Sequence, residues 1–217
     1  MKARLCWAAL LAFLLFTVVL PASAQVLYEN GPIYGETDAW TINFGFVISN
    51  TFTISTGNST VTGLSFGAWL FPGDLLESAE VTLSTQSIGG GTVFFDGTVN
   101  FTQSNCFLNN YSYDVCTETG SFTPTQMTNG TYWVTLQNAV VNDGDPVYWD
   151  ENSGIGCHSP GCPSEADNGT IGTLPSEAFS ILGTTSGTGG TVPEPGSLML
   201  FGSGALGLAG LIRRRFS

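Results

Sequence analysis

Apolar and polar residues alternate along much of the middle of the chain, most clearly between residues 40 and 50. Within that stretch, four apolar residues alternate with polar residues or glycine, an alternation broken only by Val47: Ile42, Phe44, Phe46 and Ile48. A period of two residues places such side chains on one face of a β-strand. We therefore expect a strand here, continued through residues 52–54 after a bend at Ser49-Asn50.

The same pattern recurs in short segments separated by turn-forming residues. Turn signals rich in Gly, Asn and Pro lie at 57–58, 71–74, 89–91, 129–130 and 142–144. Between them we expect strands at 61–64, 65–71, 79–85, 92–101, 115–122, 131–138 and 179–182. Short strands at intervals of about ten residues are typical of β-sandwiches and jelly rolls. The predicted fold is all-β, an antiparallel, jelly-roll-like β-sandwich over residues 25–182, and the irregular stretch 143–175 is the expected binding loop.

The N-terminus has the three parts of a signal peptide. Lys2 and Arg4 precede an apolar run at 5–20, and Ala22-Ser23-Ala24 follows it. The alternative is a retained membrane helix, but the run is short for that role, because spanning a bilayer takes about 20 residues. We predict a signal peptide over residues 1–24, cut after Ala24 by signal peptidase.

The C-terminus has a different three-part order. A Gly/Ser/Thr linker is expected at 183–191, and the sorting signal at 192–217 begins with Val192-Pro193-Glu194-Pro195. The apolar run 196–212 would span about 26 Å as a helix, at about 1.5 Å per residue. The cluster Arg213-Arg214-Arg215 after it would stay cytoplasmic. We therefore predict a C-terminal transmembrane helix that leaves the preceding domain outside.

This tail resembles the PEP-CTERM sorting signal of Gram-negative bacteria in its Pro-Glu-Pro motif, its glycine-spaced apolar helix and its final arginines. The resemblance implies recognition by an exosortase, with processing near the Pro-Glu-Pro motif, and an association with exopolysaccharide and biofilm. An ordinary C-terminal anchor is the alternative. The middle of the chain, around Trp40–Asn43 and Tyr132-Trp133, is loosely similar to uncharacterised exported β-domains with the same tail, which implies no activity.

The charges are separated along the chain. All five basic residues lie in the two termini, so no Lys or Arg occurs between Gln25 and Ile212, whereas all 17 carboxylates lie in that stretch. Binding to nucleic acid or anionic lipid by counterion release needs cationic side chains. The middle of the chain is therefore not expected to bind nucleic acid, and cations, neutral glycans or another protein remain as partners.

Four cysteines lie outside the predicted signal peptide: Cys106, Cys116, Cys157 and Cys162. An even number in an exported chain indicates disulfides, and four cysteines allow three connectivities. We favour the two local pairs, Cys106–Cys116 and Cys157–Cys162. The alternative is a zinc site beside His158, but the cysteine spacings are longer than zinc sites usually have.

The sequence contains candidates for three kinds of site. Trp133 and Trp149 are candidates for stacking on a glycan, against the alternative that each packs in the core. Asp143, Asp145, Asp150 and Glu151 are a candidate calcium site, against the alternative of solvated acidic turns, because hard cations prefer oxygen ligands. His158, the one histidine, is poorly placed as a general base, and no catalytic residues or other cofactor are predicted.

These observations predict an exported, exosortase-processed protein of the cell surface or extracellular matrix without enzymatic activity. It would be anchored in the membrane by the C-terminal helix and then reach the surface or the medium after processing. The alternative is a carbohydrate-binding module that acts on extracellular polysaccharide. A secreted hydrolase that uses a carboxylate pair is the distant alternative.

Overall fold

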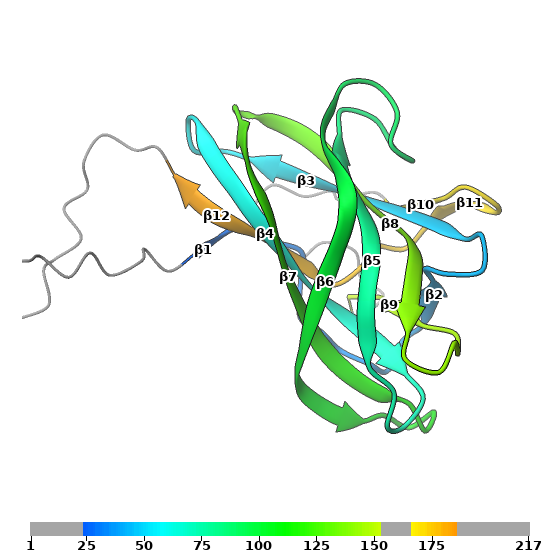
Figure 1. Cartoon of the computed structure of the whole chain (residues 1–217). Coiled ribbons are helices and arrows are strands. Elements are labelled where there is room, and N and C mark those ends of the chain that lie inside the picture. Colours follow the sequence, from blue (N-terminus) through cyan, green and yellow to red (C-terminus); the bar gives the residue numbers. More distant parts are fainter. Residues whose placement is uncertain (1–23, 153–165, 186–217) are drawn as a thin grey trace, which may run out of the picture.

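The computed structural model describes residues 24–152 and 166–185, which form twelve β-strands and no helix (Figure 1). The strands are β1 Gln25–Glu29, β2 Ala39–Thr41, β3 Val47–Ile54, β4 Ser59–Leu70, β5 Leu76–Ser84, β6 Val93–Leu108, β7 Asp114–Met127, β8 Gly130–Val141, β9 Tyr148–Asp150, β10 Ala166–Asn168, β11 Gly172–Leu174 and β12 Phe179–Thr185. Strand β12 runs three residues into the predicted linker, which begins at Gly183. The predicted signal-peptide core, sorting signal and C-terminal helix lie outside the described residues. Within the described residues, no helix is long and apolar enough to cross a membrane.

The strands form one antiparallel sheet in the order β1-β12-β4-β7-β6-β5-β8-β3-β10-β11, with β9 pairing with both β2 and β4. Strand β6 joins the two halves. Its first part, from Val93 to Asn100, pairs with β5, and its second part, from Phe101 to Leu108, pairs with β7. Because this long strand changes partner midway, the sheet curls into a half-barrel (Figure 1). The all-β antiparallel class is confirmed, but the two separate sheets of a sandwich are not.

The core fills the inside of the curled sheet. Strand β8 shows the pattern that builds it: Tyr132, Val134 and Leu136 are buried, as their alternation predicts. Aromatic rings meet there edge to face, with 5.3 Å between the ring centres of Phe66 and Phe101. The described residues contain no Lys, Arg or His. This part of the chain is therefore held by apolar burial, hydrogen bonds and a disulfide, without ion pairs between side chains.

The strand predicted across residues 40–50 is interrupted. Phe46 donates its backbone N–H to the carbonyl of Asn43 at 3.1 Å, and Phe44 and Gly45 between them have φ angles of 56° and 88°. Two central residues with positive φ make a type I′ turn, which ends the alternation. Phe44 is therefore exposed rather than buried. The bend predicted at Ser49-Asn50 is also wrong, because β3 runs straight through it.

Candidate functional site

Three turns meet at one end of the half-barrel: the β4–β5 turn, the β6–β7 turn and the β8–β9 turn (Figure 1). The β4–β5 turn follows from Pro72 and Gly73, whose φ of 97° suits the third position of a type II turn. Gly73 donates its N–H to Asp114 of β7 at 3.3 Å. Leu75 donates its N–H to the Asn142 side chain of the β8–β9 turn at 2.8 Å. These bonds tie the three turns together.

An aromatic cleft opens at this end. It has a volume of about 170 Å³ and is lined by Asp38, Ala39, Trp69, Tyr113 and Tyr148. We call this set of residues the aromatic cleft. Three rings of the cleft pack on one another, with 5.8 Å between the ring centres of Trp69 and Tyr113 and 5.6 Å between those of Tyr113 and Tyr148. The cleft thus offers ring faces and edges beside one exposed carboxylate.

The rim of the aromatic cleft is also aromatic. Tyr111, which is 55% exposed, stacks on Trp69 with 5.5 Å between ring centres and 23° between ring planes. The ring centre of Phe71, which is 37% exposed, lies 5.1 Å from the ring centre of Tyr113. Asn109 shapes this rim, because its Oδ1 accepts the N–H groups of both Tyr111 and Tyr113.

Asp150 holds the floor of the cleft. Its carboxylate accepts hydrogen bonds from the indole Nε1 of Trp69 at 2.6 Å and from the backbone N–H groups of Tyr34 at 2.7 Å and Gly35 at 3.0 Å. Burial raises the pKa of Asp150 to about 6, although these three hydrogen bonds act in the opposite direction. The neighbouring Glu151 accepts the indole N–H of Trp40 at 2.8 Å. Both carboxylates therefore serve to orient tryptophans.

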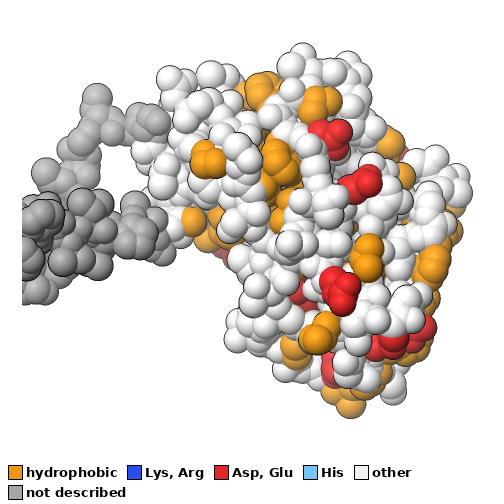
Figure 2. Space-filling model, in the orientation of Figure 1, with side chains coloured by type: hydrophobic (Ala, Val, Ile, Leu, Met, Phe, Trp, Pro, Cys, Tyr) orange, Lys and Arg blue, Asp and Glu red, His pale blue; other side chains and the backbone are white. Residues whose placement is uncertain are grey.

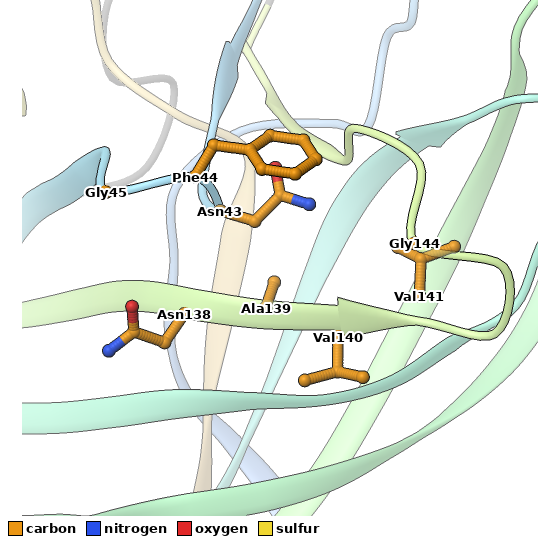
Figure 3. A pocket seen from close by; sticks show the side chains of 8 residues that line it. All are labelled: Asn43, Phe44, Gly45, Asn138, Ala139, Val140, Val141 and Gly144. Carbon is orange, nitrogen blue, oxygen red and sulfur yellow. The ribbon is translucent and has the colours of Figure 1, made fainter.

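A second, larger cleft of about 370 Å³ lies on the other side of the β8–β9 turn. Its lining residues are Asn43, Phe44, Gly45, Asn138, Ala139, Val140, Val141 and Gly144. Figure 3 shows the exposed Phe44 ring on one side of this opening and strand β8, with Ala139, on the other. The side chain of Asn43 joins the Phe44 turn to the β8–β9 turn by donating to the Asp145 carbonyl at 3.0 Å.

Three carboxylates come together where the β4–β5 and β8–β9 turns touch. Asp74, Asp143 and Asp145 offer oxygen atoms that lie within 4.8 Å of one another. Asp143 and Asp145 are exposed, whereas Asp74 is 7% exposed. Burial, then a side-chain hydrogen bond with Asp143, and then the charges of Asp143, Asp145 and Asp114 raise the pKa of Asp74 to about 6. We call Asp74, Asp143 and Asp145 the acidic triad.

The four residues expected to form a calcium site are divided by the structure. Asp143 and Asp145 lie in the acidic triad with Asp74, which the sequence analysis did not single out. Asp150 and Glu151 point instead toward Trp69, which lines the aromatic cleft, and Trp40, respectively. The spacing along the chain suggested one loop, but Asp150 is the last residue of β9, and this strand directs the second pair inward.

The two tryptophans expected to stack on a glycan differ in exposure. Trp149 is completely buried and packs edge to face on Phe66 and Phe179, so it is a core residue and offers no face to a ligand. Trp133 is half-buried on the outer side of β8, between Thr51 of β3 and Ser84 of β5. It lies on neither cleft lining. The residues of the aromatic cleft were not predicted from the sequence. The one available signal was the pair Tyr111 and Tyr113 in the β6–β7 turn.

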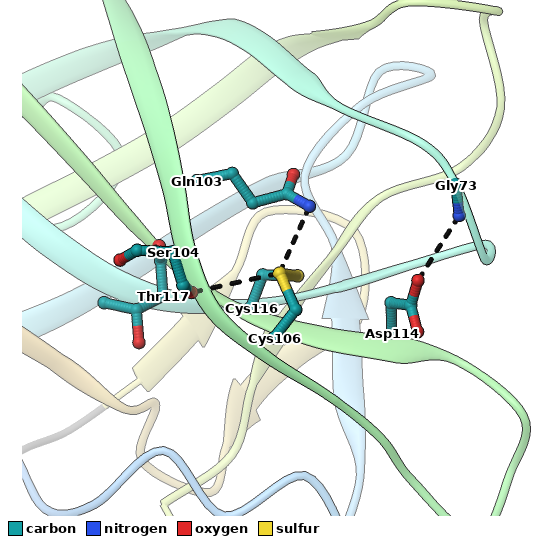
Figure 4. Close-up of a disulfide and its surroundings, with 7 residues drawn as sticks. All are labelled: Gly73, Gln103, Ser104, Cys106, Asp114, Cys116 and Thr117. Carbon is teal, nitrogen blue, oxygen red and sulfur yellow. Dashed lines mark hydrogen bonds between the residues drawn. A yellow bond between two sulfur atoms is a disulfide. The ribbon is translucent and has the colours of Figure 1, made fainter.

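Cys106 of β6 and Cys116 of β7 form a disulfide, as expected (Figure 4). It joins two strands that are already paired, just before the turn that carries Tyr111 and Tyr113. Cys157, Cys162 and His158 lie outside the described residues. The disulfide therefore links the two strands that flank the rim residue Tyr111 and its neighbour Tyr113.

Two further carboxyl groups are buried inside the fold. Glu118 of β7 is completely buried, and burial raises its pKa to about 7. Glu177 is also completely buried. Its pKa lies well above the usual value because of burial and, to a lesser degree, the charges of Glu151, Asp150 and Asp38.

Figure 2 shows acidic side chains scattered over the visible face among uncharged ones, with no lysine or arginine to offset them.

Comparison with known proteins locates one family feature, at the end of the chain. The model of the PEP-CTERM protein-sorting motif matches residues 191–215, which include the Pro-Glu-Pro motif and the arginine cluster. Searches of curated proteins and of solved structures return no match for this chain. The motif is that of exported, membrane-associated proteins targeted to an exosortase. Residues 191–215 therefore carry the PEP-CTERM sorting motif.

Proposed function

We propose that the chain is an exosortase-processed component of the cell surface or extracellular matrix that works by binding, without enzymatic activity. The observation that carries this proposal is the order of its parts. The last strand of the half-barrel ends at Thr185, and the sorting motif begins at residue 191. Signal peptidase would cut after Ala24, and the C-terminal helix would hold the half-barrel outside the membrane until an exosortase acts.

Substitution of the motif tests this proposal. Replacing Pro193, Glu194 and Pro195 by alanine should leave the half-barrel folded but block processing, so that the unprocessed chain accumulates in the membrane fraction. Pro124→Ala, at an exposed position of β7, is the matched control and should be processed normally. Equal processing and location of both variants would contradict the proposal.

The aromatic cleft favours a second, more specific function: binding of a neutral extracellular glycan. Tyr111, Tyr113 and Tyr148 present aromatic rings, and sugars are bound by stacking their C–H faces on such rings. Asp38 is exposed at the cleft and can accept hydrogen bonds from hydroxyl groups. The described surface is acidic and has no cationic side chain, which disfavours anionic polysaccharides and leaves neutral ones.

Glycan binding can be tested with the full chain and an array of neutral oligosaccharides. Tyr111→Ala should weaken binding at least tenfold, because an aromatic hot-spot residue contributes about 2 kcal/mol or more and tenfold corresponds to about 1.4 kcal/mol. Trp133→Ala removes an aromatic ring on the outer side of β8 and is the matched control. Binding that survives Tyr111→Ala but is lost in Trp133→Ala would move the site away from the cleft. Absence of binding to any neutral glycan would exclude this second function.

A further inference from the structure

The acidic triad brings together three carboxylates from two separate turns. Asp74 ends the β4–β5 turn, whereas Asp143 and Asp145 lie in the β8–β9 turn, about seventy residues later in the chain. Their oxygen atoms lie within 4.8 Å of one another. The closeness is thus a product of the tertiary fold and not of local sequence.

The two turns are held against each other by reciprocal hydrogen bonds. Leu75 donates its N–H to the Asn142 side chain at 2.8 Å, and Asn142 donates its own N–H to the Leu75 carbonyl at 3.1 Å. Each bond joins one turn to the other directly beside the acidic triad. The backbone segments that carry the three carboxylates are therefore held close together.

Asp74 is the member of the triad that most needs a partner. Its side chain is 7% exposed, and its Oδ2 atom is buried with no hydrogen-bond partner. A buried polar atom without a partner costs free energy, and a buried charge costs more. No Lys, Arg or His exists among the described residues to neutralise it. The group that could do so must come from solution.

We propose that Asp74, Asp143 and Asp145 bind a calcium ion. Calcium takes six to eight oxygen ligands at about 2.3–2.6 Å, so two ligand oxygens on one ion lie at most about 5 Å apart. The oxygens of the triad meet that limit. The exposure of Asp143 and Asp145 leaves room for water to complete the shell. Magnesium fits less well, because it requires a more rigid octahedral arrangement and gives up water reluctantly.

The ion would fix the β8–β9 turn, which lies between the two clefts. Gly144 of this turn lines the larger cleft, and Tyr148, the first residue of β9 after the turn, lines the aromatic cleft. The bound calcium thus stabilises the end of the half-barrel independently of whether a glycan occupies either cleft. With three carboxylates and an exposed position, an affinity of about 10⁻⁴–10⁻³ M is expected, as in extracellular calcium modules.

Calcium binding is measured directly on the full chain in mild detergent, after treatment with a chelator, by calorimetric titration with CaCl₂ and with MgCl₂. We expect one high-occupancy calcium site, a rise in melting temperature on adding CaCl₂, and weaker binding of magnesium. Asp143→Asn and Asp74→Asn should each weaken calcium binding at least tenfold. Glu77→Gln, an exposed carboxylate of β5, is the matched control with the same change in charge and should bind as the wild type does.

Each alternative result overturns the proposal. Absence of calcium binding by the wild type would exclude the site, and binding that persists in Asp143→Asn would place it elsewhere. Equal affinity for magnesium would contradict the calcium assignment. Asp143 is exposed, so its variant remains informative even where Asp74→Asn fails to fold. None of these measurements involves a glycan, so a negative result would not bear on the proposal that the aromatic cleft binds a glycan.

Discussion

The indole N–H of Trp69 donates a hydrogen bond to the buried carboxylate of Asp150, with 2.6 Å between nitrogen and oxygen. The same carboxylate accepts the backbone N–H groups of Tyr34 and Gly35. One acidic side chain thus joins the N-terminal segment, β4 and β9 beneath the aromatic cleft. Because Trp69 supports the stacked ring of Tyr111, the geometry of the cleft depends on a residue that no ligand in the cleft needs to touch.

This relationship predicts the effect of Asp150→Ala. Removing the carboxylate leaves three donors unsatisfied in a buried site, which should cost about 2–4 kcal/mol of unfolding free energy. Asp150→Asn retains one acceptor oxygen and should cost less. Urea unfolding of both variants measures the difference. Equal stability of Asp150→Ala and the wild type would show that the carboxylate does not hold the cleft floor.

Trp149 and Trp133 should respond very differently to truncation. Trp149 is completely buried, and Trp→Ala in a core typically costs about 3–5 kcal/mol. That loss would lower the melting temperature by about 6–20 °C, taking about 2–4 °C per kcal/mol for a domain of this size. Trp133 is half-buried, so Trp133→Ala should cost far less. Thermal unfolding followed by circular dichroism compares the two, and a larger loss at Trp133 would contradict the burial described above.

Stability should fall as the pH rises from about 4.5 to about 7. The pKa of Glu118 is about 7 in the fold against 4.5 for the free side chain, so the folded state binds more protons in this window. Stability then decreases with pH, by up to roughly 3 kcal/mol from this group. Below about pH 4.5 the contribution of the protonated group is fully present, and above about pH 7 it is lost.

Glu118→Gln isolates this effect, because the amide has a similar shape and does not titrate. The variant should be more stable than the wild type at pH 8 and should show a flatter dependence of stability on pH. Unfolding in urea across pH 4–8, with a chelator present to exclude cation effects, provides the comparison. Parallel curves for variant and wild type would mean that Glu118 ionises in the fold as readily as in water.

The disulfide should contribute to stability although it joins neighbouring strands. It closes a loop of 10 residues, and loops of this size correspond to about 2–3 kcal/mol in the chain-entropy treatment. Replacing both Cys106 and Cys116 by alanine leaves any other cysteine pair intact. We expect the double variant to unfold at lower urea concentration, with a slope at least as steep, because the denatured chain is less compact without the cross-link. Unchanged stability would show that strand pairing between β6 and β7 alone holds this end.

Local patterns in the sequence predicted the fold class well but not the curl of the sheet. The alternation around Tyr132 and Val134 identified the apolar buried face of β8 correctly, because successive side chains of a strand point to opposite faces. The curl of the sheet could not be predicted in this way. It depends on β6 changing its partner between Asn100 and Phe101, which is a choice made between distant strands.

The errors have equally local causes. Phe44 and Phe46 fit the alternation of a strand, but Gly45 between them permits a tight turn, and the turn prevailed. Asp74 was not predicted as part of the calcium site because it lies about seventy residues from Asp143 and Asp145 in the sequence. Trp149 stood among acidic residues and suggested a binding loop, yet β9 directs its ring into the core. Contacts across strands decided each of these positions, and no single segment contains that information.

The most direct test of the central claim is the intact mass of the protein isolated from the cells that produce it and from their medium. Export and exosortase processing predict a chain that begins at Gln25 and ends near the Pro193-Glu194-Pro195 motif, without the arginine cluster. Recovery of the whole chain from Met1 to Ser217 in the cytosol, and of no shortened form outside the cell, would contradict the account.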